Sequence, residues 1–345
     1  MSITKAYQKR NRKRIMLLLV LISLMLFLSW ISLISGTNGI CLADSTKLLD
    51  VNAHGSFGMI IKEIRLPRTL GALLVGMLLG LSGASMQGAL RNPLASPFTL
   101  GISQAAGFGA AFAIIILEPT AFTHPLMAKF SIALFAFGAS MVCTLMIVWI
   151  GKKVGMSPSS LILAGVGLGS LFHSGTMFLQ YFTTETNAAA TLFWTFGDLS
   201  KATWQNIGLL TCVLIPVLGY LWFSHWKFDA LGFGDESAFN RGVNVKQFRP
   251  IVLILSALCT AVAVAFFGII GFIGLVAPHL VRLVVGQSNS FVIPLSTLCG
   301  GVLLLLADLF ARLSLYPVTL PVGILTSFVG APLLLYLLVS HRKLQ

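Results

Sequence analysis

The sequence predicts an all-α polytopic membrane protein. Of its 345 residues, 57% are apolar and only 10% are charged, whereas soluble domains carry roughly 25% charged residues. The apolar stretches run for about 20 residues without strict alternation, which favours membrane-spanning helices over barrel strands. Helices and closed barrels are the backbones that satisfy their own hydrogen bonds in lipid. An ordinary soluble protein is therefore excluded.

Ten apolar segments follow one another along the chain and are expected to cross the membrane. The eighth is short and begins almost where the seventh stops, so we expect a broken or half-depth helix there. The segments are 15–35, 69–89, 98–117, 130–150, 158–180, 204–224, 250–270, 271–284, 290–310 and 319–340.

A basic tail, residues 1–14, precedes the first segment. A charged head before an apolar run also occurs in signal peptides. This run of about 20 residues is longer than the usual 7–15, however, and no A-x-A cleavage site follows it. We interpret it as a retained first span, so that residues 15–345 form a single transmembrane domain.

Positive charge orients the chain. With a cytoplasmic N-terminus, 16 of the 23 Lys and Arg residues fall on the inner side and 7 on the outer side. Cytoplasmic loops of membrane proteins are enriched in Lys and Arg. The sequence therefore predicts that both termini face the cytoplasm, and the net charge of +13 reflects topology rather than nucleic-acid binding.

Polar and helix-breaking residues within or beside the spans are candidates for a translocation path. Transporters often place broken helices beside the substrate route, which points to Gln87, Asn92 and Pro93. His173 lies inside the fifth segment, where a lone histidine lines a water-filled route or makes an interhelical contact. The glycines clustered in the spans serve close helix packing or act as hinges.

A polar segment, residues 229–249, separates the sixth and seventh spans. Within it, residues 234–242 predict a short helix. Asp235 and Glu236 would lie in its first turn, where carboxylates complement the helix dipole, and Gly242 would cap its end. Such an elbow either fits a cleft on another protein or is an ordinary inner loop.

The outer side carries an unusual group of charges. Arg65 and Arg68 flank a Leu-Pro pair just before the second span. They would anchor lipid headgroups or receive an acidic protein surface, since arginine suits bidentate carboxylate pairing. Asp308 and Arg312 are four residues apart and share a helix face. They either neutralise each other or leave Arg312 pointing outward to a partner.

Catalytic motifs are not found in the sequence. It contains neither a Gly-x4-Gly-Lys-Ser/Thr phosphate loop nor a His-Glu-x-x-His pair, and the six histidines are scattered. The five cysteines form no C-x-x-C pair, so we expect no metal site.

Several short motifs follow one another over residues 60–335. They are Arg65-Leu-Pro-Arg-Thr-Leu70, Gly83-Ala-Ser-Met-Gln87, Asn92-Pro-Leu-Ala95, Leu100-Gly-Ile-Ser103, Trp194-Thr-Phe-Gly197, Gly271-Phe-Ile-Gly-Leu-Val-Ala-Pro-His279, Ala307-Asp-Leu-Phe-Ala-Arg312, Pro321-Val-Gly-Ile324 and Gly330-Ala-Pro332. In this order they resemble the FecCD permeases, which are transmembrane subunits of ABC importers for iron-siderophores, haem and vitamin B12.

The resemblance implies a type II importer permease of ten transmembrane helices that works as a homo- or heterodimer. A cytoplasmic ATPase dimer would bind beneath the pair, and an extracytoplasmic substrate-binding protein would dock above it. This chain would hold no cofactor, because ATP and Mg belong to the ATPase. The docking arginines map onto Arg65, Arg68 and Arg312. The ATPase-coupling residues map onto Leu231, Gly234, Asp235, Glu236, Ala238, Arg241 and Gly242.

Two positions depart from the family pattern. Asp198 stands where the usual Trp-x-x-Gly-Ser-Leu motif has serine, and Asn240-Arg241-Gly242 replaces a more usual Leu-Gly. We expect a non-enzymatic permease for a ferric siderophore in the bacterial cytoplasmic membrane. Haem or cobalamin transport within the same family and an ion-coupled secondary transporter are the alternatives.

Overall fold

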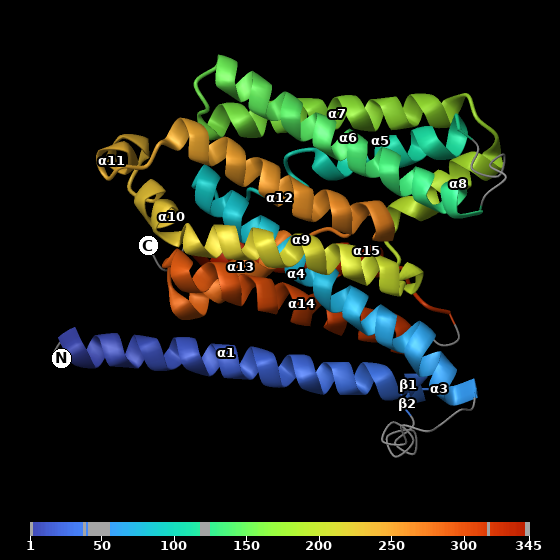
Figure 1. Ribbon diagram of the computed structural model, residues 1–345, viewed down its shortest axis with the longest axis horizontal. Coiled ribbons are helices and arrows are strands. Elements are labelled where there is room, and N and C mark those ends of the chain that lie inside the picture. Colours follow the sequence, from blue (N-terminus) through green and yellow to red (C-terminus); the bar gives the residue numbers. More distant parts are fainter. Residues whose placement is uncertain (1–2, 37–38, 41–55, 118–124, 316–317, 342–345) are drawn as a thin grey trace.

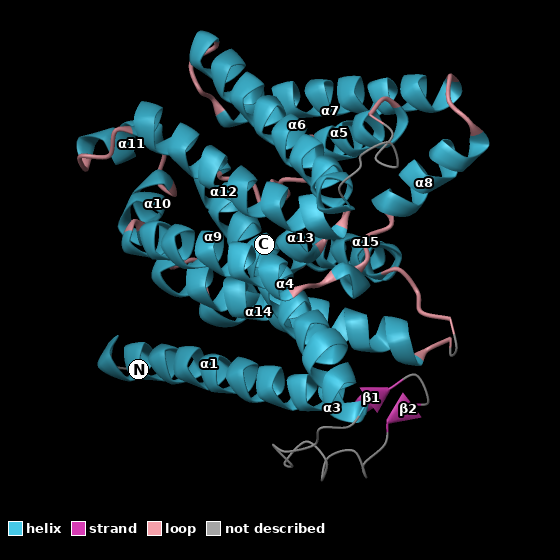
Figure 2. Cartoon of the chain, turned by 45° about the vertical axis from the view of Figure 1, so that its right-hand side comes forward, coloured by secondary structure: helices cyan, strands magenta, loops and turns pink. Residues whose placement is uncertain are grey.

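The computed structural model describes residues 3–36, 39–40, 56–117, 125–315 and 318–341, which are overwhelmingly helical (Figures 1 and 2). The predicted all-α class is confirmed.

All ten predicted apolar segments lie on helices. These are α1 (Ile3–Ile34), α4 (Leu66–Leu90), α5 (Ile102–Ile115), α6 (Pro125–Lys153), α7 (Pro158–Tyr181), α9 (Trp204–Phe223), α12 (Val245–Phe267), α13 (Ile273–Val285), α14 (Asn289–Leu313) and α15 (Val322–His341). Within the described part of the chain, seven helices are long and apolar enough to cross a membrane, whereas α5, α13 and the described apolar part of α15 are shorter. Length and composition alone therefore support fewer crossings than the ten predicted.

The first helix begins earlier than the apolar run that predicted it. It starts at Ile3 and has 32 residues, so it is about 48 Å long at 1.5 Å per residue. A typical hydrocarbon core is only about 30 Å thick. The basic tail therefore continues the span as helix, and Arg14 lies 4.1 Å above the ring of Phe291.

Short elements connect the long helices. They are β1 (Ser35–Gly36), β2 (Gly39–Ile40), α3 (Ser56–Ile60), the π-helical turn η1 (Ile61–Arg65), α8 (Glu185–Thr195), the 3₁₀ turn η3 (Leu199–Lys201), α10 (His225–Leu231) and α11 (Asp235–Asn240). The strands β1 and β2 pair in antiparallel fashion. Helix α8 was not predicted, and the Thr184 side chain caps its start by accepting from the Asn187 N–H.

The expected break after the seventh segment is present. Helix α12 ends at Phe267, just before Gly268, whose φ is 77°, and α13 begins after Phe272, whose φ is 65°. A positive φ lies outside the right-handed helical region, so the backbone at these two residues prevents α12 from continuing into α13. The eighth segment is accordingly a separate helix of 13 residues.

Helix α4 is the centre of the molecule, packed between α12, α13 and α14 (Figure 1). A Cβ atom at Gly76 would collide with the Gly300 carbonyl of α14, and one at Gly83 would collide with the Gly274 carbonyl of α13. Small residues allow such close backbone approach between membrane helices. Packing is thus the structural role of these two glycines.

The helices run between two opposite ends of the molecule (Figure 1). The start of α1 lies at the same end as α10 and α11, which we call the elbow end. The end of α1, the start of α4 and helix α8 lie at the other end, which we call the arginine end. The predicted elbow and the predicted docking arginines are therefore on opposite sides.

Candidate functional site: an arginine cluster and a helical elbow

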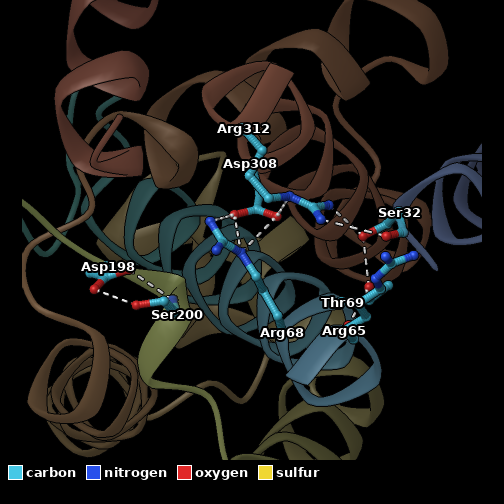
Figure 3. Close-up of polar contacts among 8 residues, drawn as sticks. All are labelled: Ser32, Arg65, Arg68, Thr69, Asp198, Ser200, Asp308 and Arg312. Atoms are coloured by element: carbon cyan, nitrogen blue, oxygen red, sulfur yellow. Dashed lines mark hydrogen bonds and ion pairs between the residues drawn. The ribbon is translucent and has the colours of Figure 1, made fainter. Parts of the chain in front are cut away.

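A buried carboxylate joins two arginines at the arginine end (Figure 3). Arg68 donates to Asp308 Oδ1 from Nε at 3.0 Å and from Nη2 at 2.9 Å. Arg312 Nε lies 3.0 Å from Asp308 Oδ2. Asp308 is fully buried, so both arginines compensate a charge that water cannot reach. Of the two alternatives for Asp308 and Arg312, the structure shows the pairing, and Arg68 joins it.

The same cluster holds the last turn of α1. Arg65 Nη1 donates to the Leu33 carbonyl at 2.7 Å, and Arg312 Nη2 donates to Ser32 Oγ at 2.7 Å. Ser32 also shares a 2.7 Å hydrogen bond with Thr69 of α4. The carbonyl end of a helix attracts positive charge, so these arginines fasten α1 to α4 and α14.

The three predicted docking arginines therefore lie together, but two of them are mostly covered. The side chains of Arg68 and Arg312 are each 13% exposed. Asp308 is shared by Arg68 and Arg312, whereas Arg65 binds the Leu33 carbonyl, and the three arginines and Asp308 have a summed charge of +2. The cluster is a positive site in which Arg68 and Arg312 are already paired with Asp308, rather than three free side chains.

At the elbow end the predicted short helix is confirmed as α11. Gly234 precedes it with φ 108°, and Gly242 follows it with φ 83°. Both values fall in the region that glycine adopts most readily. Asp235 and Glu236 occupy the first turn as expected. Two glycines thus allow the chain to turn sharply at each side of the helix.

The elbow has an inner and an outer face. Leu231 and Ala238 are fully buried, so these two predicted coupling residues hold the elbow on the protein. Phe233 and Phe239 are 69% and 71% exposed, and the Arg241 guanidinium lies 4.3 Å above the Phe233 ring. Sequence reasoning missed both aromatic residues, although Phe233 lies between two glycines of the predicted elbow and Phe239 lies within its predicted helix.

A buried arginine fastens the elbow to the helices. Arg249 is completely buried and donates to both oxygens of Asp235 at 2.9 and 2.8 Å. It also donates to the carbonyls of Ala89, at 2.9 Å, and Met156, at 2.8 Å. Four hydrogen bonds therefore join α11 to the end of α4 and to the loop after α6. The sequence signal for this contact was an arginine near the start of an apolar helix.

Asp235 is shared with a second arginine. Arg91 Nη2 lies 3.3 Å from Asp235 Oδ1. The hydrogen bond from Arg249, helped by the charges of Arg249 and Arg91, lowers the pKa of Asp235 against the opposing effect of burial. The elbow therefore keeps its ionised carboxylate throughout the neutral range.

Three of the predicted pathway residues line one cavity beside the elbow. The cavity has a volume of about 960 Å³ and includes Gln87, Asn92 and Pro93. Gln87 is buried, accepts from Arg282 and donates to the Gly274 carbonyl at 3.4 Å. Gln87 therefore joins α4 to α13 at the wall of this cavity.

His173 lies elsewhere. It is exposed on α7 and lines a separate groove of about 430 Å³ with Gln104, Gly165 and Gly169. The structure therefore does not bring His173 together with the other three candidates.

Asp198, which departs from the family pattern, lines a third cavity of about 680 Å³ near α8. The Asp198 carboxylate accepts from the Ser200 N–H at 2.8 Å and from its hydroxyl at 2.6 Å (Figure 3). Asp198 thus caps η3 while lining the cavity with Lys201. Among the described residues, no group of three His, Cys, Asp or Glu side chains could hold a metal ion.

Comparison with known proteins finds relatives that match almost the whole chain. A protein of Methanocaldococcus jannaschii, whose name assigns it provisionally to the ABC transporter permeases, is 44% identical over 99% of this chain and 99% of its own length. The Fe(3+)-citrate import system permease protein YfmE of Bacillus subtilis is 36% identical over 99% of this chain and its full length. Other relatives are named as hemin and vitamin B12 permeases.

A solved structure and a family match agree with these relatives. The structure is an inward-facing conformation of a protein provisionally assigned as a metal-chelate type ABC transporter. It has a TM-score of 0.79 and 31% identity, and the match covers 94% of this chain and 98% of that one. The FecCD transport family matches residues 15–340. This chain is therefore a multi-pass permease subunit of an ABC importer and belongs to the FecCD transport family.

Proposed function

We propose that this permease carries a ferric siderophore across the bacterial cytoplasmic membrane, with haem and cobalamin as the alternative cargoes. Ferric-citrate and hemin permeases among its relatives support an iron chelate. A secondary transporter would need a titratable group free to exchange ions. Asp308, the acid of α14, is instead held by two arginines, which argues against ion coupling.

The two ends of the molecule take different partners in this proposal. The elbow end faces the cytoplasm with both termini, as the excess of Lys and Arg on that side indicates. The elbow, residues 229–249, receives the ATPase dimer, and the arginine end receives a substrate-binding protein. Residues 15–345 act as one transmembrane domain beside a second permease subunit, either a copy or a relative. Both ATP and Mg belong to the ATPase.

The exposed aromatic face of the elbow is the observation that carries the ATPase assignment. Phe233 and Phe239 are large apolar side chains on a polar segment, with Glu236 and Arg241 exposed beside them. Interfaces concentrate their binding energy in buried aromatic and arginine side chains surrounded by polar groups. The inner residues Leu231 and Ala238 support that face, because they anchor the elbow from below.

The elbow then transmits the motion of the ATPase to the helices. Arg249 joins α11 to the end of α4 and the loop after α6, so displacement of the elbow moves these segments together. ATP binding would tilt the helices as rigid bodies and alternate the route between outward-open and inward-open states. Cargo would pass between the two permease subunits, and Gln87, Asn92, Pro93 and His173 remain candidates for its path.

A truncation of the elbow face tests this assignment. We expect Phe239→Ala to weaken association with the ATPase at least tenfold, because hot-spot truncations cost about 2 kcal/mol or more. The measurement is titration of purified ATPase onto the permease in nanodiscs. Phe182→Ala is the matched control, since Phe182 is equally exposed, at 71%, outside the elbow. Equal affinities for wild type and Phe239→Ala would contradict the proposal.

The cargo is tested by uptake. A strain lacking the permease should lose uptake of an iron-55-labelled ferric siderophore and regain it with the intact gene. Unlabelled hydroxamate, catecholate and citrate chelates, haem and cobalamin are added in turn as competitors. Transport that survives depletion of ATP would exclude the importer mechanism, and competition by haem or cobalamin alone would replace the siderophore.

A further inference from the structure

The arginine cluster contains its own acid. Asp308 is fully buried and accepts hydrogen bonds from Arg68, and it forms an ion pair with Arg312. Arg65 binds the end of α1 instead. Two of the three positive charges thus face the one negative charge. An acidic partner that approaches this end meets guanidinium groups whose attraction is already partly satisfied within the chain.

The placement of these four charged groups means that Asp308 and a carboxylate of the binding protein would compete for the same arginines. The two arginines bound to Asp308 keep 13% of their side-chain surface exposed, and both direct their guanidinium groups at the Asp308 carboxylate (Figure 3). Arg68 uses Nε and Nη2 for Asp308. A carboxylate arriving from outside would contact the same guanidinium groups and share their charge with Asp308.

We propose that Asp308 is an internal counter-ion that sets the strength of docking. By neutralising one of the charges of Arg68 and Arg312, it keeps the complex with an acidic binding protein from becoming too tight. The proposal rests on the docking role of the arginines proposed above. Asp308 acts on docking through Arg68 and Arg312 rather than by contact with the binding protein.

The physical reason is charge balance at a partly desolvated site. With Asp308 the cluster has a net charge of +2, and without it the net charge is +3. Attraction between charges strengthens as water is excluded, and complementary charge accelerates association in a salt-dependent manner. Removal of Asp308 should therefore tighten docking and steepen its dependence on salt.

Docking is measured with the complete importer. The permease and ATPase complex is placed in nanodiscs and titrated with the fluorescently labelled, soluble substrate-binding protein of the same importer at several salt concentrations. We expect Asp308→Asn to lower Kd about tenfold at low salt, which corresponds to about 1.4 kcal/mol, with a smaller gain at high salt. Unchanged or weaker docking would overturn the inference.

A second variant pair decides the question if Asp308→Asn does not fold. Arg68→Gln should weaken docking about tenfold, because it lowers the net charge to +1. Adding Asp308→Asn to it returns the net charge to +2 and removes both members of a buried pair, which is often tolerated. Docking of the double variant should recover toward wild type. A double variant as weak as Arg68→Gln would overturn the inference.

Two further variants separate this inference from the docking proposal itself. Arg65→Gln leaves Asp308 and its two arginines untouched and should still weaken docking. Lys153→Gln removes one exposed positive charge at the elbow end of α6 and should leave docking unchanged. If neither Arg65→Gln nor Arg68→Gln weakens docking, the docking role fails. If both weaken it while Asp308→Asn brings no gain, only the counter-ion role fails.

Discussion

Each end of the permease contains a group of one aspartate and two arginines, and the two groups are arranged in opposite ways. At the arginine end, Asp308 is shared by Arg68 and Arg312. At the elbow end, Asp235 is shared by Arg249 and Arg91. Each site therefore has one carboxylate between two guanidinium groups.

The difference lies in which group is buried. Asp308 is fully buried, and its arginines are each 13% exposed. Arg249 is fully buried, whereas Asp235 is 39% exposed and Arg91 38%. A buried acid leaves surplus positive charge at the surface, while a buried arginine fastens a surface acid to the interior. The first arrangement suits attraction of a partner, and the second suits transmission of force.

The largest effect on stability should follow loss of the buried acid. Asp308→Asn would leave Arg68 and Arg312 without the charge that compensates them. Breaking a buried ion pair costs about 3–5 kcal/mol, so we expect a loss of about 4 kcal/mol in the free energy of unfolding. The measurement is reversible denaturation of the purified permease in detergent. A loss below about 1 kcal/mol would mean that water reaches the cluster.

A smaller loss should follow removal of the buried arginine. Arg249→Met keeps the volume of the side chain but strips the Ala89 and Met156 carbonyls of their donor. Because Asp235 can turn to water, we expect a loss of about 2 kcal/mol, within the range for unsatisfied buried acceptors. ATP hydrolysis should continue while uptake per ATP falls, which is measured in proteoliposomes.

Arg91→Gln is the matched control for that prediction. It removes the other arginine of Asp235, but the pair is more than one-third exposed, and exposed ion pairs contribute about 0–1 kcal/mol. Uptake per ATP should stay near wild type. If Arg91→Gln uncouples hydrolysis as strongly as Arg249→Met, burial is not what makes the connection rigid.

The smallest effect should be the pH dependence of the elbow. The pKa of Asp235 is lowered from 3.8, chiefly by the hydrogen bond from Arg249. A depressed carboxylate pKa adds stability above the unfolded pKa, and that stability disappears as pH falls through the folded pKa. The difference in thermal stability between wild type and Asp235→Asn should hold from neutral pH toward 3.8 and vanish below. A difference that fades near neutral pH would show that Arg249 does not bind the carboxylate in solution.

Much of the fold could be predicted because its signals are local. Apolar runs of about 20 residues specify membrane helices wherever they occur. The ten segments were therefore found in the right order. The α11 helix was also found from its own residues, since Asp235, Glu236 and Gly242 act within one or two turns. Helix α8 was missed because it is short and lacks such an apolar run.

By itself, the sequence determined the class of the protein, the order of its helices and the position of its elbow. Only the tertiary structure decided which charges meet. Arg68 and Asp308 are 240 residues apart, and Arg249 and Ala89 are 160 apart. The burial of Asp308 and the exposure of Phe239 were likewise set by packing. Hydropathy and helix caps depend on neighbouring residues, whereas the partner of a buried charge depends on which helices lie against each other.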